Sequence, residues 1–311
     1  MEKLIVLTGP TAVGKTDLSI KLAKKINGEI ISADSIQVYR GFDIGSAKIS
    51  KEEMQGVPHH LIDVLDPTDD FNVYIFKEMA KKACDEIYAK GHIPIIVGGT
   101  GFYIQALLYD IDFAKEDNSK VRKRLEDEAK KEGINKLYER LKELDPEYAL
   151  SVHPNNEKRV IRALEYIELN GKKFSTHNEE ESNRVSPYDF NYFVLNDDRK
   201  KLYERIDKRV DIMMENGLFN EVTDLLNGGI SRESNAMQGI GYKEFIPYFD
   251  GLKSLDEVIS DIKQDSRHFA KRQLTWFRRE KCVTFIDRTL YHSDDEILDF
   301  MLGEIYGKES Q

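Results

Sequence analysis

The sequence has few cysteines and no hydrophobic run long enough to cross a membrane. Its 311 residues include two cysteines, Cys84 and Cys282, which form no paired ligand motif. A disulfide framework or a zinc site is therefore not expected. No apolar stretch approaches the roughly 20 residues of a membrane-spanning helix, and the first residues do not resemble a secretory leader. These absences predict a cytoplasmic protein that does not contact a membrane.

The chain also lacks an excess of positive charge. Its formal net charge is −10, with 40% hydrophobic and 33% charged residues, which is typical of a globular protein. An acidic balance argues against indiscriminate nucleic-acid binding but leaves room for a local basic groove. Residues 261–282 are such a local exception, with seven Lys and Arg against three Asp and Glu.

One glycine-containing stretch follows an apolar run at residues 4–7 and leads into a helical pattern. Strand, glycine-rich turn and Gly-Lys-Thr at a helix start form the phosphate-binding P-loop in its required context. Backbone N–H groups and the helix N-terminus favour an anion there, Lys15 would reach phosphate oxygens, and the Thr16 hydroxyl would bind Mg²⁺. The stretch consists of Gly9, Pro10, Thr11, Ala12, Val13, Gly14, Lys15 and Thr16.

Asp34 follows the second expected strand, residues 29–34, and opens a polar cluster that continues through Gln37. Ligands of open α/β sheets lie at the carboxyl ends of the strands. Asp34 would therefore lie near the P-loop if the two strands are parallel and adjacent. A turn or helix-cap carboxylate is the alternative interpretation. His59 and His60, in a third short extended stretch, point to opposite faces and make a poor metal pair.

A continuous apolar run at residues 93–97 predicts a strand buried on both faces of a parallel sheet. It leads into a second glycine cluster, Gly98 to Gly101, which includes Thr100. Glycines at the carboxyl end of a strand leave room for a ligand. A simple tight turn is the alternative.

The composition changes near Asp112. Residues 115–133, 135–144 and 156–170 are charged, amphipathic helical patterns without intervening strands, and residues 171–187 are polar and loop-like. These patterns predict an inserted helical domain at 112–190 between two parts of an α/β core, 1–111 and 191–311. Arg159 and Arg162 share a helix face within this insertion. That face is either a solvent-exposed basic surface or a binding surface.

After the insertion the sequence predicts strands at 192–195 and 283–287, and helices at 199–216, around 219–226 and at 255–279. The segment 236–242 is a glycine-containing turn. On the long last helix, Phe269, Trp276 and Phe277 stand near basic residues, either as stacking faces for nucleic acid or as core. The predicted fold is a P-loop NTPase-like, doubly wound, mainly parallel α/β sheet with an inserted all-helical domain.

Several motifs, in order along nearly the whole chain, resemble one family. They are GPTAVGKT at 9–16, ISADSIQVYRGFDIGSAK at 31–48, VPHHLIDV at 57–64, VGGTGFYIQAL at 97–107, RVIRALE at 159–165, AMQGIGYKE at 236–244 and FAKRQLTWFR at 269–278. The sequence thus resembles the bacterial tRNA dimethylallyltransferases, also called tRNA isopentenyltransferases or IPP transferases.

The resemblance implies transfer of a dimethylallyl group from dimethylallyl diphosphate to the exocyclic N6 amine of adenosine 37, 3′ of the anticodon, in tRNAs that read codons beginning with U. The P-loop would then bind the donor diphosphate, with Lys15 and Mg²⁺ at Thr16 stabilising the departing charge. The family has a further arginine on the helix after the inserted domain. Arg209 is its best match and Arg205 the competitor.

The resemblance also implies how the acceptor is held. Asp34 is assigned as the general base that positions the amine, and Ser35 and Gln37 would orient the adenine. A target adenosine must leave the anticodon-loop stack to reach a buried donor. The residues expected to contact tRNA or line its channel are Asp34, Ser35, Ile36, Gln37, Thr100, Arg122, Lys158, Arg159, Arg162, Gln238, Gly239, Gly241 and Tyr242. Many family members have Gln where this chain has Lys158.

The expected partners are the tRNA anticodon stem-loop and dimethylallyl diphosphate, with Mg²⁺ as cofactor, and a monomer without an obligate protein partner. An adenylate isopentenyltransferase acting on free AMP, ADP or ATP is one alternative, although free nucleotides would not need the insertion. A P-loop small-molecule kinase acting on ATP is another. A nucleotide-dependent binding switch without chemistry is a third, and it would not need Asp34.

Overall fold

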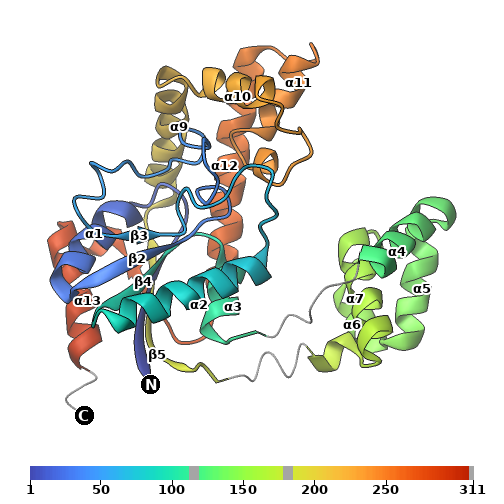
Figure 1. The fold of residues 1–311 in the computed structure, drawn as a ribbon, viewed down its shortest axis with the longest axis horizontal. Helices are drawn as coiled ribbons and strands as arrows, with labels where there is room; N and C mark the ends of the chain where they lie inside the picture. Colours follow the sequence, from blue (N-terminus) through green and yellow to red (C-terminus); the bar gives the residue numbers. More distant parts are fainter. Residues whose placement is uncertain (112–118, 178–184, 308–311) are drawn as a thin grey trace. The chain divides into compact units, whose positions relative to one another are not determined.

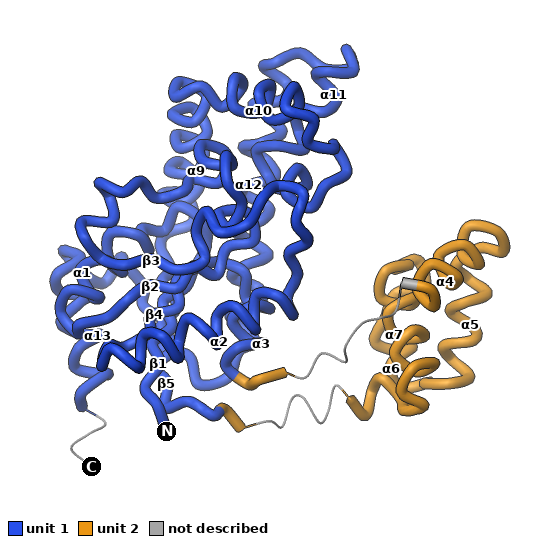
Figure 2. The backbone as a smooth tube through the Cα atoms, in the orientation of Figure 1, with its two compact units in different colours: residues 1–108, 187–311 blue, residues 109–186 orange. Residues whose placement is uncertain are grey.

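The computed structural model describes residues 1–111, 119–177 and 185–307. The chain divides into two compact units, drawn in different colours in Figure 2. Unit 1 comprises residues 1–108 and 187–311, and unit 2 comprises residues 109–186. The predicted insertion of 112–190 thus differs from unit 2 by three or four residues at each end.

Unit 1 alternates strands and helices along the chain (Figure 1). Its strands are β1 (Glu2–Thr8), β2 (Gly28–Ala33), β3 (His59–His60), β4 (Ile93–Gly98), β5 (Tyr188–Asn196) and β6 (Val283–Asp287). Its α-helices are α1 (Lys15–Ile26), α2 (Val73–Ala89), α3 (Gly101–Leu108), α9 (Arg199–Glu215), α10 (Leu218–Asn227), α11 (Ile246–Phe249), α12 (Leu255–Phe277) and α13 (Asp294–Gly307). Short 3-10 turns η1 (Ala236–Gln238), η2 (Lys243–Phe245) and η3 (Arg288–Leu290) complete it.

The six strands form one sheet in the order β3-β2-β4-β1-β5-β6, and every pair is parallel. The P-loop strand β1 is central, between β4 and β5. β4 separates β1 from β2, so of the two conditions set for placing Asp34 near the P-loop the strands are parallel but not adjacent. Because parallel strands end at one edge, both loops still reach the same edge of the sheet. The predicted doubly wound P-loop-like fold is confirmed, with a fully parallel sheet.

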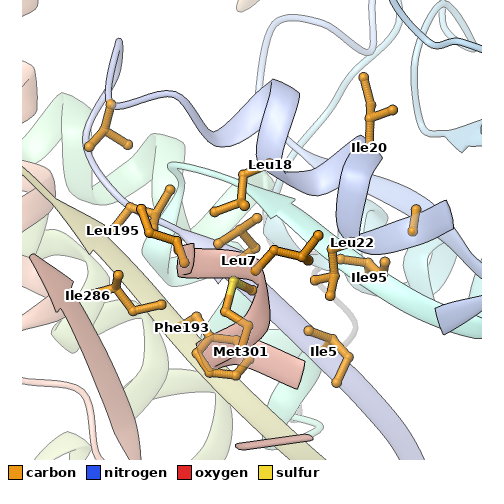
Figure 3. Packing of buried hydrophobic residues seen from close by; sticks show 14 of the residues in the cluster. Ile5, Leu7, Leu18, Ile20, Leu22, Ile95, Phe193, Leu195, Ile286 and Met301 are labelled. Atoms are coloured by element: carbon orange, nitrogen blue, oxygen red, sulfur yellow. The ribbon is translucent and has the colours of Figure 1, made fainter. Parts of the chain in front are cut away.

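Alternate residues of the central strands face opposite sides of the sheet. Ile5 and Leu7 belong to a buried cluster that joins the sheet to Leu18 and Leu22 of α1 and Met301 of α13 (Figure 3). On the opposite face Leu4, Val6, Ile31 and Ile96 are fully buried, as are Phe76, Ala80 and Ile87 of α2. Helices therefore cover both faces, and the polar groups of the site are confined to the strand ends.

Unit 2 is helical and has its own hydrophobic core. Its helices are α4 (Ser119–Glu132), α5 (Ile134–Leu144), α6 (Pro146–Ser151) and α7 (Glu157–Asn170). Leu125, Leu141 and Leu164 are fully buried in its core. The fully buried Asp145 caps α6 by accepting from the Tyr148 N–H at 3.1 Å, and it accepts from the Ser175 N–H at 2.7 Å.

The sequence patterns did not predict α3, α6, α13 or the four-residue α11. α3 begins in the glycine cluster for which the sequence predicts a ligand approach or a tight turn, and α6 is short and starts at a proline. α13 is hydrophobic on much of its surface, so no clear amphipathic face marks it. The beginning of the predicted 115–133 helix and part of the predicted 171–187 loop lie outside the described residues. In the described ranges, no helix combines the length and apolar composition of a membrane span.

A buried carboxylate at the amino end of β2 ties three elements together. Glu29 is 2% exposed on its side chain and accepts hydrogen bonds from His60 Nε2 at 2.7 Å, His92 Nδ1 at 2.7 Å and Lys90 Nζ at 3.0 Å. Burial alone would raise the pKa of Glu29, but the bonds from His60, His92 and Lys90 outweigh it and lower the pKa to about 2. The folded protein therefore favours the charged form.

We expect Glu29→Gln to lower the free energy of unfolding at pH 7 by about 2–4 kcal/mol, because it leaves buried donors poorly paired. The folded pKa of Glu29 lies below its ordinary value of 4.5. The stabilising effect is therefore full above pH 4.5 and is lost as the pH falls toward 2. Urea unfolding at several pH values measures this, with the exposed Glu86→Gln as control. A pH-independent difference between wild type and Glu29→Gln would contradict the assignment.

Candidate active site

The carboxyl ends of β1, β2 and β4 meet closely in unit 1. The Thr8 hydroxyl donates to the Gly98 carbonyl at 2.6 Å, and the Thr100 N–H donates to the Ala33 carbonyl at 3.4 Å. A side chain at Gly98 would begin only 2.4 Å from the Ala33 oxygen. The P-loop, Asp34 and Thr100 therefore start from strand ends that are in contact, as the sequence analysis expected for a ligand site.

The P-loop connects β1 to α1 through backbone conformations that L side chains rarely adopt. Gly9 has φ 147° and Gly14 has φ 93°. A Cβ at Gly9 would lie 2.4 Å from the Leu195 carbonyl oxygen, so glycine is required there. The loop leads directly into the N-terminus of α1, where unpaired backbone N–H groups favour an anion.

Lys15, the first residue of α1, is folded back onto this loop. Its Nζ donates to the carbonyl oxygens of Gly9 at 3.0 Å and Pro10 at 2.8 Å. Burial and then the charge of Arg209 lower the pKa of Lys15 to about 7, against the opposing charge of Asp34. The lysine is therefore poised to regain its full charge when an anionic group arrives beside it.

Asp34 is positioned by its own turn. One carboxylate oxygen, Oδ1, accepts from the backbone N–H groups of Ile36 at 2.8 Å and Gln37 at 3.2 Å. Burial raises the pKa of Asp34, although these two bonds and the charges of Lys15 and Lys48 act in the opposite direction. A carboxylate with a raised pKa is a better proton acceptor than an exposed one. The Asp34 carboxylate thus stabilises its own turn by accepting backbone hydrogen bonds, and it is also a candidate general base.

The two arginines that compete for a place beside the P-loop differ in their partners. Arg205 Nη2 is paired with Asp197 Oδ2 at 2.6 Å. Arg209, one helical turn further along α9, forms no ion pair or hydrogen bond with the described residues. Burial and then the charge of Arg205 lower the pKa of Arg209, and Arg209 in turn acts on Lys15. Arg209 is therefore the uncompensated cation of the pair.

Gln37 is fully engaged within the protein. Its Oε1 accepts from the Ser32 hydroxyl at 3.2 Å, and its Nε2 donates to the carbonyls of Ser46 at 3.1 Å and Ala47 at 3.3 Å. In this structure the side chain fixes the 46–47 segment. Ser35 and Ile36 are half-buried beside it.

Glu221 of α10 organises the loop that follows the Asp34 turn. Its carboxylate accepts from the backbone N–H groups of Asp43 at 3.1 Å, Ile44 at 2.7 Å and Gly45 at 3.0 Å, and from the Tyr242 hydroxyl at 2.8 Å. Its function could not be recognised from the sequence, because a single Glu on an amphipathic helix has no distinctive motif.

The 236–242 turn packs against the Asp34 turn. A Cβ at Gly239 would lie 2.9 Å from Ile36, and one at Gly241 would lie 3.2 Å from the Gly45 oxygen. Tyr242 is 0% exposed, so it supports this contact instead of presenting a surface to a ligand. Gln238 is exposed, and its Nε2 donates to the Arg232 carbonyl at 2.9 Å.

Gln273 of α12 links the two glycine-rich loops, a function that the sequence analysis missed. Its Oε1 accepts from the Thr11 N–H at 2.9 Å and its Nε2 donates to the Gly99 carbonyl at 3.0 Å. It is 5% exposed. A polar residue among the apolar positions of an amphipathic helix, within a family-like motif, was the available signal.

A basic groove lies along the last turns of α12. It has a volume of about 370 Å³, and no ion pair links its Lys and Arg side chains to a carboxylate in the described ranges. Trp276 lines it, contacts Phe102 edge-on and covers Gly101. Phe277 is fully buried, so it belongs to the core. The lining residues are His268, Lys271, Arg272, Thr275, Trp276 and Arg279.

Unit 2 holds the remaining predicted contact residues. Arg122 and Lys158 line one groove of about 670 Å³ together with His153 and Asn156. Arg122 is also 3.4 Å from Glu126 and from Glu165. Arg159 and Arg162 are exposed, and both lie close enough to Tyr148 to oppose the burial that raises its pKa. Arg162 also stacks over Phe174.

Thr16 is the candidate metal ligand. It is exposed at the start of α1, and its backbone carbonyl accepts from the Ser19 hydroxyl at 2.7 Å. The described part of the chain contains no cluster of three or more His, Cys, Asp or Glu that could hold a metal ion. A threonine hydroxyl at the start of this helix is an oxygen ligand of the kind that Mg²⁺ takes in phosphate-binding loops.

Comparison with known proteins identifies the family. A sequence profile described as IPP transferase matches residues 37–280, and one described as isopentenyl transferase matches residues 2–66. The tRNA dimethylallyltransferase of Lachnoclostridium phytofermentans is 56% identical over 310 residues, which are 99% of each chain.

Solved structures agree. The tRNA delta(2)-isopentenylpyrophosphate transferase of Staphylococcus epidermidis is 46% identical with a TM-score of 0.73, over 99% of this chain and 100% of that one. A eukaryotic dimethylallyltransferase acting on tRNA is 31% identical with a TM-score of 0.80, over 92% of this chain and 74% of that one.

The chain belongs to the IPP transferase family, and it is a prenyltransferase. Within this class it is a tRNA dimethylallyltransferase, an enzyme that modifies tRNA. The resemblance carried by the sequence motifs is thereby confirmed. An adenylate isopentenyltransferase and a small-molecule kinase are not favoured.

We expect diphosphate binding above pH 7 to be accompanied by proton uptake at Lys15. Free Lys15 has a pKa of about 7, and a bound anion raises it. Affinity is therefore full below pH 7 and declines as the pH rises above it. Calorimetry with inorganic diphosphate at pH 8, in two buffers of different ionisation enthalpy, counts the protons. Lys15→Arg stays charged and supplies the baseline; equal uptake by both proteins would exclude Lys15 as the source.

We expect Gln273→Met to raise the KM for the prenyl donor about tenfold, because it removes both bonds between the P-loop and the Gly99 turn while keeping side-chain volume. Steady-state kinetics with varied donor tests this. The exposed Gln264→Met on the same helix is the control. Identical donor KM values for the two variants would show that this link does not shape the donor site.

Proposed function

We propose that this enzyme transfers a dimethylallyl group from dimethylallyl diphosphate to the N6 amine of adenosine 37, 3′ of the anticodon, in tRNAs reading codons that begin with U. One observation carries this proposal: Asp34, whose pKa is raised by burial, shares a sheet edge and direct charge coupling with Lys15 of the P-loop. A base and an anion-binding loop at one place suit proton loss from the acceptor and departure of a diphosphate.

In the proposed reaction the N6 amine attacks C1 of the dimethylallyl group while the C1–O bond to the diphosphate breaks. The proton lost by N6 passes to the Asp34 carboxylate, which the backbone N–H groups of Ile36 and Gln37 hold in place. The electron pair of the broken bond stays on the diphosphate. The P-loop, Lys15 and Arg209 stabilise this charge. Mg²⁺ held by Thr16 and the donor would supply further neutralisation.

The acceptor side fits a single-stranded RNA loop. The 236–242 turn and the Asp34 turn pack together, and Thr100 stands beside them at the end of β4. On α12 the basic groove offers cations and Trp276 for phosphate contact and stacking. In unit 2, Arg122, Lys158, Arg159 and Arg162 provide further cations. These surfaces explain how an acidic protein binds a polyanion locally.

We propose further that the enzyme works in the cytoplasm as a monomer. Its donor is dimethylallyl diphosphate and its acceptor is the anticodon stem-loop of a tRNA. Mg²⁺ is its cofactor. No membrane or obligatory protein partner is part of this proposal.

Asp34→Asn is the decisive variant. We expect kcat to fall by about 10²- to 10⁴-fold with donor affinity retained, because the amide keeps an acceptor oxygen but cannot take up a proton. The assay combines purified protein, Mg²⁺, labelled dimethylallyl diphosphate and an unmodified anticodon stem-loop with A at position 36.

Three controls define the acceptor: a stem-loop with G at position 37, a stem-loop with a different base at position 36, and free AMP. Label in AMP but not in RNA would assign the activity to free nucleotides. Full activity of Asp34→Asn would remove Asp34 from the chemistry. Equal labelling of stem-loops with any base at position 36 would refute the codon specificity.

A further inference from the structure

An arginine that the proposed reaction does not use lies against the P-loop. Arg288 is the first residue after β6, and its turn is fixed by Asp287, whose Oδ1 accepts from the Thr289 N–H at 2.9 Å and hydroxyl at 2.7 Å. β6 is two strands away from β1 in the sheet, about 10 Å. The Arg288 side chain nevertheless reaches the loop, where its guanidinium lies beside Gly14.

The guanidinium group of Arg288 packs against Gly14. A Cβ built on Gly14 would lie 3.2 Å from Arg288 Nη1 and 3.4 Å from Cζ. Gly14 precedes Lys15 and has φ 93°, so this contact is at the point where the P-loop turns into α1.

The charge of Arg288 is compensated on one side only. Its Nη2 pairs with Asp294 Oδ1 at the start of α13, whereas Nη1 is buried without a hydrogen-bond partner among the described residues. The side chain is 20% exposed. Buried donors without an acceptor are uncommon and require an explanation. Here the unpaired side of the cation is the side that approaches the anion-binding loop.

We propose that Arg288 is a positioning residue for the donor diphosphate, acting through the P-loop. Packed against Gly14, its guanidinium adds positive potential to the loop and holds the conformation from which the backbone N–H groups of α1 are presented. Asp294 moderates this potential. The proposal rests on the proposed function for the identity of the ligand as a diphosphate.

The two members of the pair provide opposite tests. Removing the cation weakens the field at the loop, whereas neutralising Asp294 strengthens it, provided that Arg288 acts through charge. If the pair served only to hold β6 against α13, both changes would loosen the loop and both would weaken binding. The sign of the Asp294 effect therefore separates the two explanations.

The experiment measures binding of inorganic diphosphate with Mg²⁺ by calorimetry for the full-length protein and four variants. We expect Arg288→Gln to raise Kd about fivefold, Arg288→Lys to restore it to within about twofold, and Asp294→Asn to lower it about twofold. Asp295→Asn, which changes the same charge in the exposed pair with Lys21, should have no effect. Stem-loop binding should be equal in Arg288→Gln and wild type.

Each result decides one question. Failure of the wild-type protein to bind diphosphate would overturn the proposed function itself. Normal wild-type binding with Arg288→Gln equal to Asp295→Asn would overturn the assignment of Arg288. Weaker binding by both Arg288→Gln and Asp294→Asn, with lower melting temperatures, would assign the pair a structural function and overturn the electrostatic one. If Arg288→Gln weakened stem-loop binding as much as diphosphate binding, the electrostatic explanation would likewise be overturned.

Discussion

The active site depends on positive groups gathered at one sheet edge with little compensating charge. Burial and the charge of Arg209 lower the pKa of Lys15, and burial and the charge of Arg205 lower the pKa of Arg209. Such an arrangement is unfavourable in the free protein and becomes favourable when a diphosphate arrives. The parallel sheet makes it possible, because its hydrophobic faces hold the strand ends rigid while backbone and side-chain polar groups point outward from one edge.

Much of this could be predicted from the sequence because the relevant signals are local. The P-loop is recognisable from glycine spacing and its strand–helix context, and the apolar run at 93–97 indicates a fully buried strand. The order of strands is a different matter: β4 lies between β1 and β2, and no local pattern encodes which strand inserts there. Asp34 reaches the site because all three strands are parallel and end together.

Residues that act across the fold were not predictable in this way. Gln273 is 262 positions from Thr11, its hydrogen-bond partner, and Glu221 binds a loop 176 to 178 positions earlier. Tyr242 shows the converse. Its motif suggested a ligand contact, but a phenol on a loop can equally be buried when a carboxylate accepts a hydrogen bond from its hydroxyl, as Glu221 does. Only the packed structure distinguishes these two outcomes.

The hydrogen bonds that Glu221 accepts limit which sequence changes this region of the enzyme can tolerate. One carboxylate satisfies three consecutive amides and a buried hydroxyl, so its loss would remove four hydrogen bonds at once. No single replacement elsewhere can restore them. Substitutions in α10, in the 43–45 loop and at Tyr242 should therefore be tolerated only as a set. Relatives are expected either to retain the whole arrangement or to have replaced it as a block, with few intermediate combinations.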